Sequence, residues 1–131
     1  MIKHNRDWFS ITLSQLPLLF GLLACSATMA KSVKTADQAM DLVMTSVEKN
    51  RLLNIPKACV FLMENGSTDV YWGIDVRENH TENCGGDPDT APRLMSYEVN
   101  KKTGKLCTDS IKWAEQLNAD DPYDFSCRPI K

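Results

Sequence analysis

Apolar residues in this chain recur first with the period of a helix and then with the period of a strand. From Thr35, the segment TADQAMDLVMTSVEKN repeats apolar positions every three or four residues. They form one stripe, whose members are Ala36, Met40, Val43 and Val47. Thr35 and Gln38 make a capping-box pattern at the start, and Pro56 cannot continue a helix. The pattern predicts an amphipathic helix that begins at Thr35 and ends before Asn54.

Two strand-like segments follow this helix. The run 58–65 is apolar and ends at the pair Asn65-Gly66, which is typical of tight hairpin turns. Residues 69–80 alternate between apolar and polar, and the alternation places four residues on one face: Val70, Trp72, Ile74 and Val76. This alternation predicts a half-buried strand with the helix as its cover.

The second half of the chain continues in the same way. Residues 93–100 alternate, with one face made of Met95, Tyr97 and Val99. A turn that contains Gly104 leads to a short strand over 105–109. A second, short helix is expected over 109–117, capped by Asp109 or Ser110. It should bury Ile111 and Ala114, together with Trp113 or Leu117.

The order of these elements predicts an α+β fold. An N-terminal helix packs on a four-stranded antiparallel meander, and a short C-terminal helix follows. We expect residues 31–131 to form a single small domain, because the segment contains no repeat or low-complexity stretch. The tail 118–131 has too little periodicity to fold alone, so Cys127 is expected to fasten it.

The first thirty residues are predicted to be a signal peptide. Lys3 and Arg6 precede an apolar run that is too short for a membrane-spanning helix. Two processing sites remain open. We favour cleavage after Ala30, because the first helix begins almost at once. Alternatively, LLAC resembles a lipobox, in which Cys25 becomes the acylated first residue. Both predict an exported protein, periplasmic or secreted, and the second predicts an outer-membrane lipoprotein.

The number of cysteines agrees with an exported protein. Either processing site removes Cys25 from the domain or attaches a lipid to it, which leaves four of the five cysteines: Cys59, Cys84, Cys107 and Cys127. Four cysteines in a small exported domain predict two disulfides. Three pairings are compatible with the sequence, which does not choose among them, and we favour Cys59–Cys84 with Cys107–Cys127. A zinc site is disfavoured because the chain has no C-x-x-C pair.

Charge narrows the choice of partner. The chain has 15 basic and 17 acidic residues, and removal of Lys3, Arg6 and Asp7 with the leader leaves 13 and 16, a net charge of −3 with His80 neutral. The sequence has no basic run with interleaved aromatic residues, so nucleic acid is not expected as a partner. No second apolar span exists either, so we expect membrane attachment only through Cys25.

The stretch HTENCGGDPDTAPR, residues 80–93, carries the candidate chemistry. His80 and Cys84 could act as base and nucleophile, but a disulfide sulfur is not a nucleophile. Four side chains could in principle ligate a metal: Glu78, His80, Asp87 and Asp89. A zinc site normally uses several histidines or cysteines, and His80 is the one histidine left after the leader is removed. We therefore expect no catalytic residue, metal or cofactor here.

The same stretch has the composition of a shaped recognition loop. Gly85 and Gly86 allow the backbone to turn, and together with Glu78 they are expected to anchor the loop. Arg93 is expected to form a forked ion pair with Glu78 or Asp87. Long ordered loops in small domains tend to carry recognition. We therefore expect a protein partner to contact His80, Asp87, Asp89, Thr90 and Arg93.

Two short motifs resemble a known family. TADQA at the start of a helix and YEVNKKTGKL at a hairpin are similar to PepSY-type domains, which are small cystatin-like modules of secreted and envelope proteins. The resemblance covers about half of the exported chain, and Asn100 stands where the family usually has aspartate. The loop 80–93 is not part of the family's pattern. The resemblance implies the α+β fold and a tendency to bind or inhibit other proteins.

These observations predict a non-enzymatic exported module that binds or inhibits an envelope or periplasmic protein. Two alternatives remain open at this stage. One is a small periplasmic hydrolase that uses the histidine and carboxylate cluster, and the other is a structural envelope lipoprotein.

Overall fold

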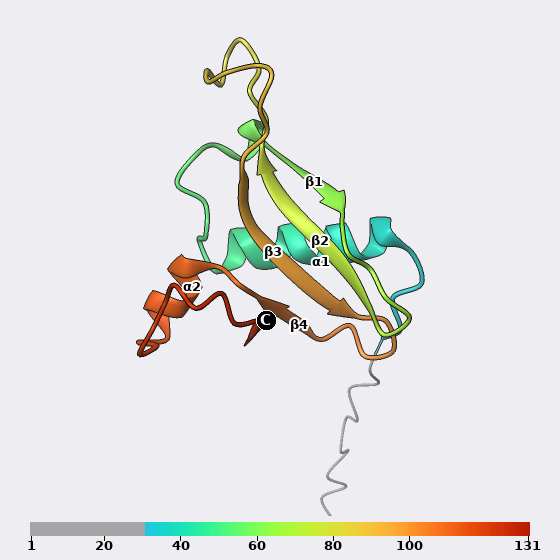
Figure 1. Ribbon diagram of the computed structural model, residues 1–131. Coiled ribbons are helices and arrows are strands. Elements are labelled where there is room, and N and C mark those ends of the chain that lie inside the picture. Colours follow the sequence, from blue (N-terminus) through green and yellow to red (C-terminus); the bar gives the residue numbers. More distant parts are fainter. Residues whose placement is uncertain (1–30) are drawn as a thin grey trace, which may run out of the picture.

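A five-stranded antiparallel sheet is covered on one face by a single long helix in the computed structural model, which describes residues 31–131 (Figure 1). The elements are α1 (Ala36–Lys49), the short 3-10 helix η1 (Lys57–Cys59), β1 (Val60–Glu64), β2 (Tyr71–Glu78), β3 (Arg93–Asn100), β4 (Leu106–Thr108), α2 (Ile111–Gln116) and β5 (Arg128–Ile130). The strands are neighbours in their sequence order, so the predicted α+β class and antiparallel meander are confirmed. The predicted signal peptide, both processing sites and Cys25 lie outside the described residues.

Helix α1 begins as its capping pattern predicts. The Thr35 side chain accepts a hydrogen bond from the Gln38 backbone N–H at 3.2 Å, and the Gln38 side chain accepts one from the Lys34 N–H at 2.9 Å. The predicted apolar stripe was partly wrong. Val43 and Val47 are buried and Met40 packs against the core, as predicted, but Ala39 and Ser46 are also buried and Ala36 is only partly buried.

Ser46 lies on the buried face of the helix although it is polar. A stripe defined by apolar residues does not include it, yet the Tyr97 hydroxyl reaches it at 3.4 Å. Its own hydroxyl donates to the Lys131 carbonyl at 3.4 Å. A buried hydroxyl is tolerated when it has such partners. Ser46 can therefore face the sheet beside Val43 and Val47.

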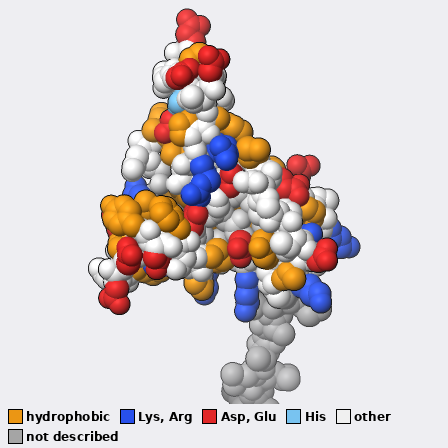
Figure 2. All heavy atoms as spheres, in the orientation of Figure 1, with side chains coloured by type: hydrophobic (Ala, Val, Ile, Leu, Met, Phe, Trp, Pro, Cys, Tyr) orange, Lys and Arg blue, Asp and Glu red, His pale blue; other side chains and the backbone are white. Residues whose placement is uncertain are grey.

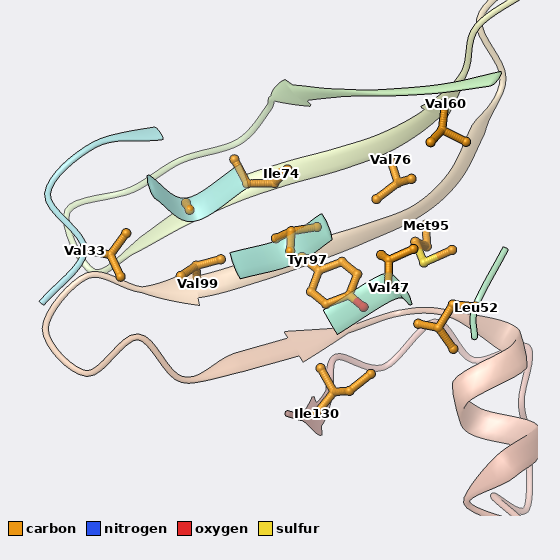
Figure 3. Close-up of a cluster of buried hydrophobic side chains, with 12 residues drawn as sticks. Val33, Val47, Leu52, Val60, Ile74, Val76, Met95, Tyr97, Val99 and Ile130 are labelled. Carbon is orange, nitrogen blue, oxygen red and sulfur yellow. The ribbon is translucent and has the colours of Figure 1, made fainter. Parts of the chain in front are cut away.

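The core lies between α1 and the sheet. It contains the alternating residues predicted for the central strands: Ile74, Val76, Met95, Tyr97 and Val99. Figure 3 shows these side chains pointing from the sheet into the core. Val70 was wrongly assigned to this face, because it precedes β2 and is 61% exposed.

The β1–β2 connection explains why Val70 leaves the sheet. Gly66 adopts a positive φ of 74°, and the chain then folds back over the open face of β2. A Cβ atom at Gly73 would lie 2.1 Å from the Asn65 carbonyl oxygen, so only glycine permits this approach. The hairpin is therefore longer than a two-residue turn, and Val70 belongs to its outer surface.

The C-terminal tail contains a strand that the sequence analysis missed. Strand β5 pairs with β4, and Ile130 lies opposite Leu106 in the core. Ser110 caps α2 and Ala114 is buried, as predicted, whereas Ile111 is only partly buried. Of the two alternatives for the helix's further contact, Trp113 packs against the core whereas Leu117 is 48% exposed. Within residues 31–131, no helix is both long and apolar enough to cross a membrane.

Candidate functional site

The connection between β2 and β3, residues 79–92, projects beyond the end of the sheet (Figure 1). We call these residues the β2–β3 loop. A disulfide between Cys59 and Cys84 joins the loop to the segment that leads into β1, and a second disulfide joins Cys107 to Cys127. The favoured pairing is therefore the one that the structure contains. The first disulfide fixes the middle of the loop to the sheet.

His80 is held at both ring nitrogens inside this loop. Its Nε2 lies 2.5 Å from Glu78 Oε2, and its Nδ1 lies 2.7 Å from the Asp87 carbonyl oxygen. Neither of these oxygens is a hydrogen-bond donor, so the geometry suits an imidazolium that donates from both nitrogens. The hydrogen bond to Glu78, followed by that to the Asp87 carbonyl, raises the pKa of His80.

The loop backbone is shaped by Gly86 and Asp87. Gly86 has a φ of +83°, and a Cβ atom there would lie 2.8 Å from three atoms of the His80 ring. Asp87 Oδ1 accepts the Asp89 N–H at 2.9 Å, which makes an Asx-type turn. The Thr90 hydroxyl donates to the Asp87 carbonyl at 3.1 Å and lies 3.2 Å from His80 Nδ1. The loop is therefore closed by its own side chains.

The predicted contact residues fall into two groups. His80, Asp87 and Thr90 form one hydrogen-bonded cluster, and Asp89 adjoins it in the turn. Arg93 lies apart from this cluster: it binds Asp109 at 2.7 Å and Ser96 at 3.0 Å, so the expected fork onto Glu78 or Asp87 was wrong. The strand register shifts at Val76/Arg77, which puts Arg93 opposite Arg77 at the base of the loop.

A polar network at the base of the loop was not found from the sequence. Asp75, with a side chain only 3% exposed, accepts hydrogen bonds from Asn65 at 3.0 Å, Ser96 at 2.6 Å and Arg77 at 2.8 Å. Burial alone would raise the pKa of this carboxyl, but the three sets of hydrogen bonds and the Arg77 charge lower it. Arg77 also donates to the Ala91 carbonyl at 3.0 Å, so the network fastens the returning end of the loop.

The outward surface of the loop is acidic. Glu82, Asp87 and Asp89 are exposed, and Figure 2 shows carboxylates gathered at this tip. The cleft beside His80 has a volume of about 110 Å³. Small-molecule sites usually have volumes of roughly 300–1,000 Å³, so this cleft is small for a substrate. The projecting shape and exposed carboxylates suit a contact surface.

One further cluster of potential metal ligands lies in the described part of the chain. Glu98 and the sulfurs of Cys107 and Cys127 lie within 4.8 Å of one another. These two sulfurs are joined in a disulfide, so they do not offer the thiolates that bind metal.

Comparison with known proteins gives no information on function, so the function is inferred from the geometry of the site. No protein-family model matches the chain, and neither a curated protein nor a solved structure matches it. The resemblance to PepSY-type domains therefore stays a prediction.

Proposed function

We propose that this protein acts by binding another protein through the β2–β3 loop, as a non-enzymatic module of the bacterial envelope or periplasm. The observation that carries the proposal is that His80 holds the loop together and is not free to react. Both of its ring nitrogens are used to hold the loop together, whereas the carboxylates of Asp87 and Asp89 lie at the exposed tip.

A closed loop of this kind lowers the cost of association. Fixing the backbone of one flexible residue costs about 1–2 kcal/mol. In this loop the disulfide, the Asx-type turn and the His80 hydrogen bonds have already fixed the backbone before a partner arrives. Binding energy is then not spent on ordering the loop, which favours tight inhibition or capture.

The charge of the tip indicates the chemistry of the partner. Glu82 and Asp89 are exposed, and their side chains make no hydrogen bond within residues 31–131. Carboxylates in this state steer the approach of a basic surface and add specificity to the contact. The partner that fits best is an envelope protein with a basic surface or cleft, such as a hydrolase that the loop could block.

A hydrolase that uses the His80–Glu78 pair has less support. A general base needs a ring nitrogen with a free lone pair within reach of the substrate, whereas both nitrogens face acceptors here. The cleft of about 110 Å³ leaves little room for a substrate. The structural lipoprotein alternative depends on acylation of Cys25, which a mass measurement of the exported protein would reveal.

Removal of the tip charges tests the proposal. The double variant Glu82→Ala/Asp89→Ala keeps the internal hydrogen bonds of the loop, and Glu115→Ala/Asp120→Ala is a control that removes two exposed carboxylates elsewhere. Proteins retained by the immobilised wild type from a bacterial envelope extract are identified, and their affinities are then measured. We expect the loop variant to lose about tenfold or more in affinity at unchanged melting temperature, while the control binds like the wild type. Equal binding by all three proteins would refute a contact through this loop.

A further inference from the structure

Lysines from separate parts of the chain meet at the end of the molecule opposite the β2–β3 loop. The turn between β3 and β4 lies between two grooves. Lys31 lines one groove, and Lys49, Lys105 and Lys131 line the other. Lys101 and Lys102 are in the turn itself. We call this surface the basic end, and it consists of Lys31, Lys49, Lys101, Lys102, Lys105 and Lys131.

Specific contacts hold the basic end together. The Val33 N–H donates to the Lys101 carbonyl at 2.8 Å, and the Trp72 indole N–H donates to the Val33 carbonyl at 3.0 Å. The Lys101 ammonium lies 4.1 Å from the centre of the Trp72 ring. A Cβ atom at Gly104 would lie 3.0 Å from the Lys31 carbonyl oxygen, which shows how closely the entering chain runs past the turn.

The basic end differs in charge from the rest of the domain. The two grooves and the turn between them contain six lysines and one acidic residue, Asp41. Residues 31–131 as a whole instead carry −3, with 13 basic and 16 acidic residues. Figure 2 shows basic side chains at this end and carboxylates at the loop tip.

Two exposed apolar side chains lie among these lysines. Leu42 is 38% exposed, and its Cδ1 would lie 4.0 Å from a Cβ atom at Gly104. Val70 is 61% exposed, and its carbonyl accepts the Lys101 N–H at 3.0 Å. Lysines around exposed aliphatic groups are the composition of surfaces that rest on a membrane interface, where ammonium groups meet headgroups and apolar groups enter the acyl boundary.

We propose that the basic end binds the surface of a membrane that contains anionic phospholipids, which is a mode of attachment separate from the Cys25 anchor expected from the sequence. Lysines are mobile point charges, which suit fluid phosphate headgroups better than a fixed site of paired hydrogen bonds. The β2–β3 loop lies at the far end of the sheet and would then point away from the bilayer (Figure 1). This proposal does not depend on what the loop binds.

Both processing sites predicted from the sequence agree with this orientation. Acylation of Cys25 would tether the chain to the bilayer a few residues before Lys31. Cleavage after Ala30 would instead give Lys31 an additional α-ammonium charge. Either event adds membrane affinity at the same end of the domain.

Vesicle co-sedimentation of the exported protein tests the proposal. The vesicles contain phosphatidylcholine alone or phosphatidylcholine mixed with phosphatidylglycerol, each at low and at high salt. The test variant is Lys102→Gln/Lys105→Gln. The matched control is Lys57→Gln/Lys112→Gln, which removes two lysines outside the basic end. Any contribution of a lipid anchor is the same in all three proteins.

We expect stronger binding to the mixed vesicles than to phosphatidylcholine, and we expect high salt to remove the difference. Each lysine near an anionic surface contributes about a fivefold factor, so the test variant should bind the mixed vesicles about thirtyfold more weakly. The control should change far less. Equal partition to both vesicle types, or an equal loss in the two double variants, would overturn the proposal. Binding of the basic end to an acidic protein or to DNA, without any binding to vesicles, would also overturn the proposal.

Discussion

Gly86 lies against the face of the His80 imidazole, where a Cβ atom would approach three ring atoms to 2.8 Å. This contact sets the distance between the two halves of the β2–β3 loop. The ring can bridge Glu78 and the Asp87 carbonyl because Gly86 has no side-chain carbon to occupy the space against the ring.

Substitution of Gly86 by alanine should therefore open the loop. Gly85→Ala is the matched control, because Gly85 also has a positive φ, 73°, but has open space around its Cβ position. We expect Gly85→Ala to cost about 1 kcal/mol of unfolding free energy from backbone strain. Gly86→Ala should cost about 1–2 kcal/mol more, because the ring must also move. Urea unfolding measures both, and equal costs would contradict the packing described for His80.

The raised pKa of His80 makes loop stability depend on pH. A group whose pKa is higher in the folded state stabilises fully below its unfolded-state pKa, and the stabilisation is lost as the pH rises through the folded-state pKa. The loop should therefore be firmest when His80 is protonated. Above the raised pKa, one ring nitrogen faces an acceptor without a proton.

A comparison of wild type with His80→Gln measures this effect. We expect the difference in unfolding free energy between the two proteins to shrink as the pH rises across the histidine titration. The pKa itself can be read from the imidazole proton shifts in NMR spectra. A value at or below that of an unstructured histidine would show that the Glu78 hydrogen bond does not hold the proton.

Loss of the Asp75 carboxylate should destabilise the base of the loop. The variant Asp75→Ala leaves Arg77 half-buried without its ion pair and leaves Ser96 without its acceptor. Removal of one partner of a buried pair costs about 3–5 kcal/mol. Asp69→Ala, on the exposed hairpin, should stay within about 0.5 kcal/mol of the wild type. Thermal unfolding of both variants checks this, and a small effect at Asp75 would show that the network is dispensable.

The two disulfides should stabilise the fold to a similar extent, but each should order a different part of the chain. Their sequence separations are 25 and 20 residues, for which loop closure in the unfolded chain predicts about 3 kcal/mol each. Cys59→Ser/Cys84→Ser should loosen the β2–β3 loop and weaken partner binding. Cys107→Ser/Cys127→Ser should loosen the β4–β5 pairing and leave the loop intact. Hydrogen exchange of the loop amides separates the two cases. If the loop amides exchange at the same rate in both variants, the Cys59–Cys84 disulfide does not hold the loop in place.

The parts of the fold that depend on local patterns could be predicted from the sequence. The Thr35 cap, the alternation through Met95 and Tyr97, and the Ser110 cap all depend on residues a few positions apart. The favoured disulfide pairing joined cysteines that are neighbours along the chain, and the structure contains that pairing.

The missed features depend on contacts between distant segments. Strand β5 is three residues long with Pro129 at its centre, so it shows no strand pattern until β4 supplies a partner. The Asp75 network joins residues from the β1–β2 hairpin, β2 and β3, and Arg93 pairs with Asp109, which is 16 residues away in the sequence. The lysines of the basic end also come from separate parts of the sequence, so the net charge gives no indication of this surface.

A photo-cross-linking amino acid in place of Asp89 tests the central claim most directly, because it reports what contacts the loop in living cells. The same amino acid in place of Asp120, an exposed residue in the C-terminal tail, is the reference position. We expect a discrete adduct with a protein from position 89 and none from position 120. Absence of an adduct at 89, or the same adducts from both positions, would contradict a protein that works by presenting this loop.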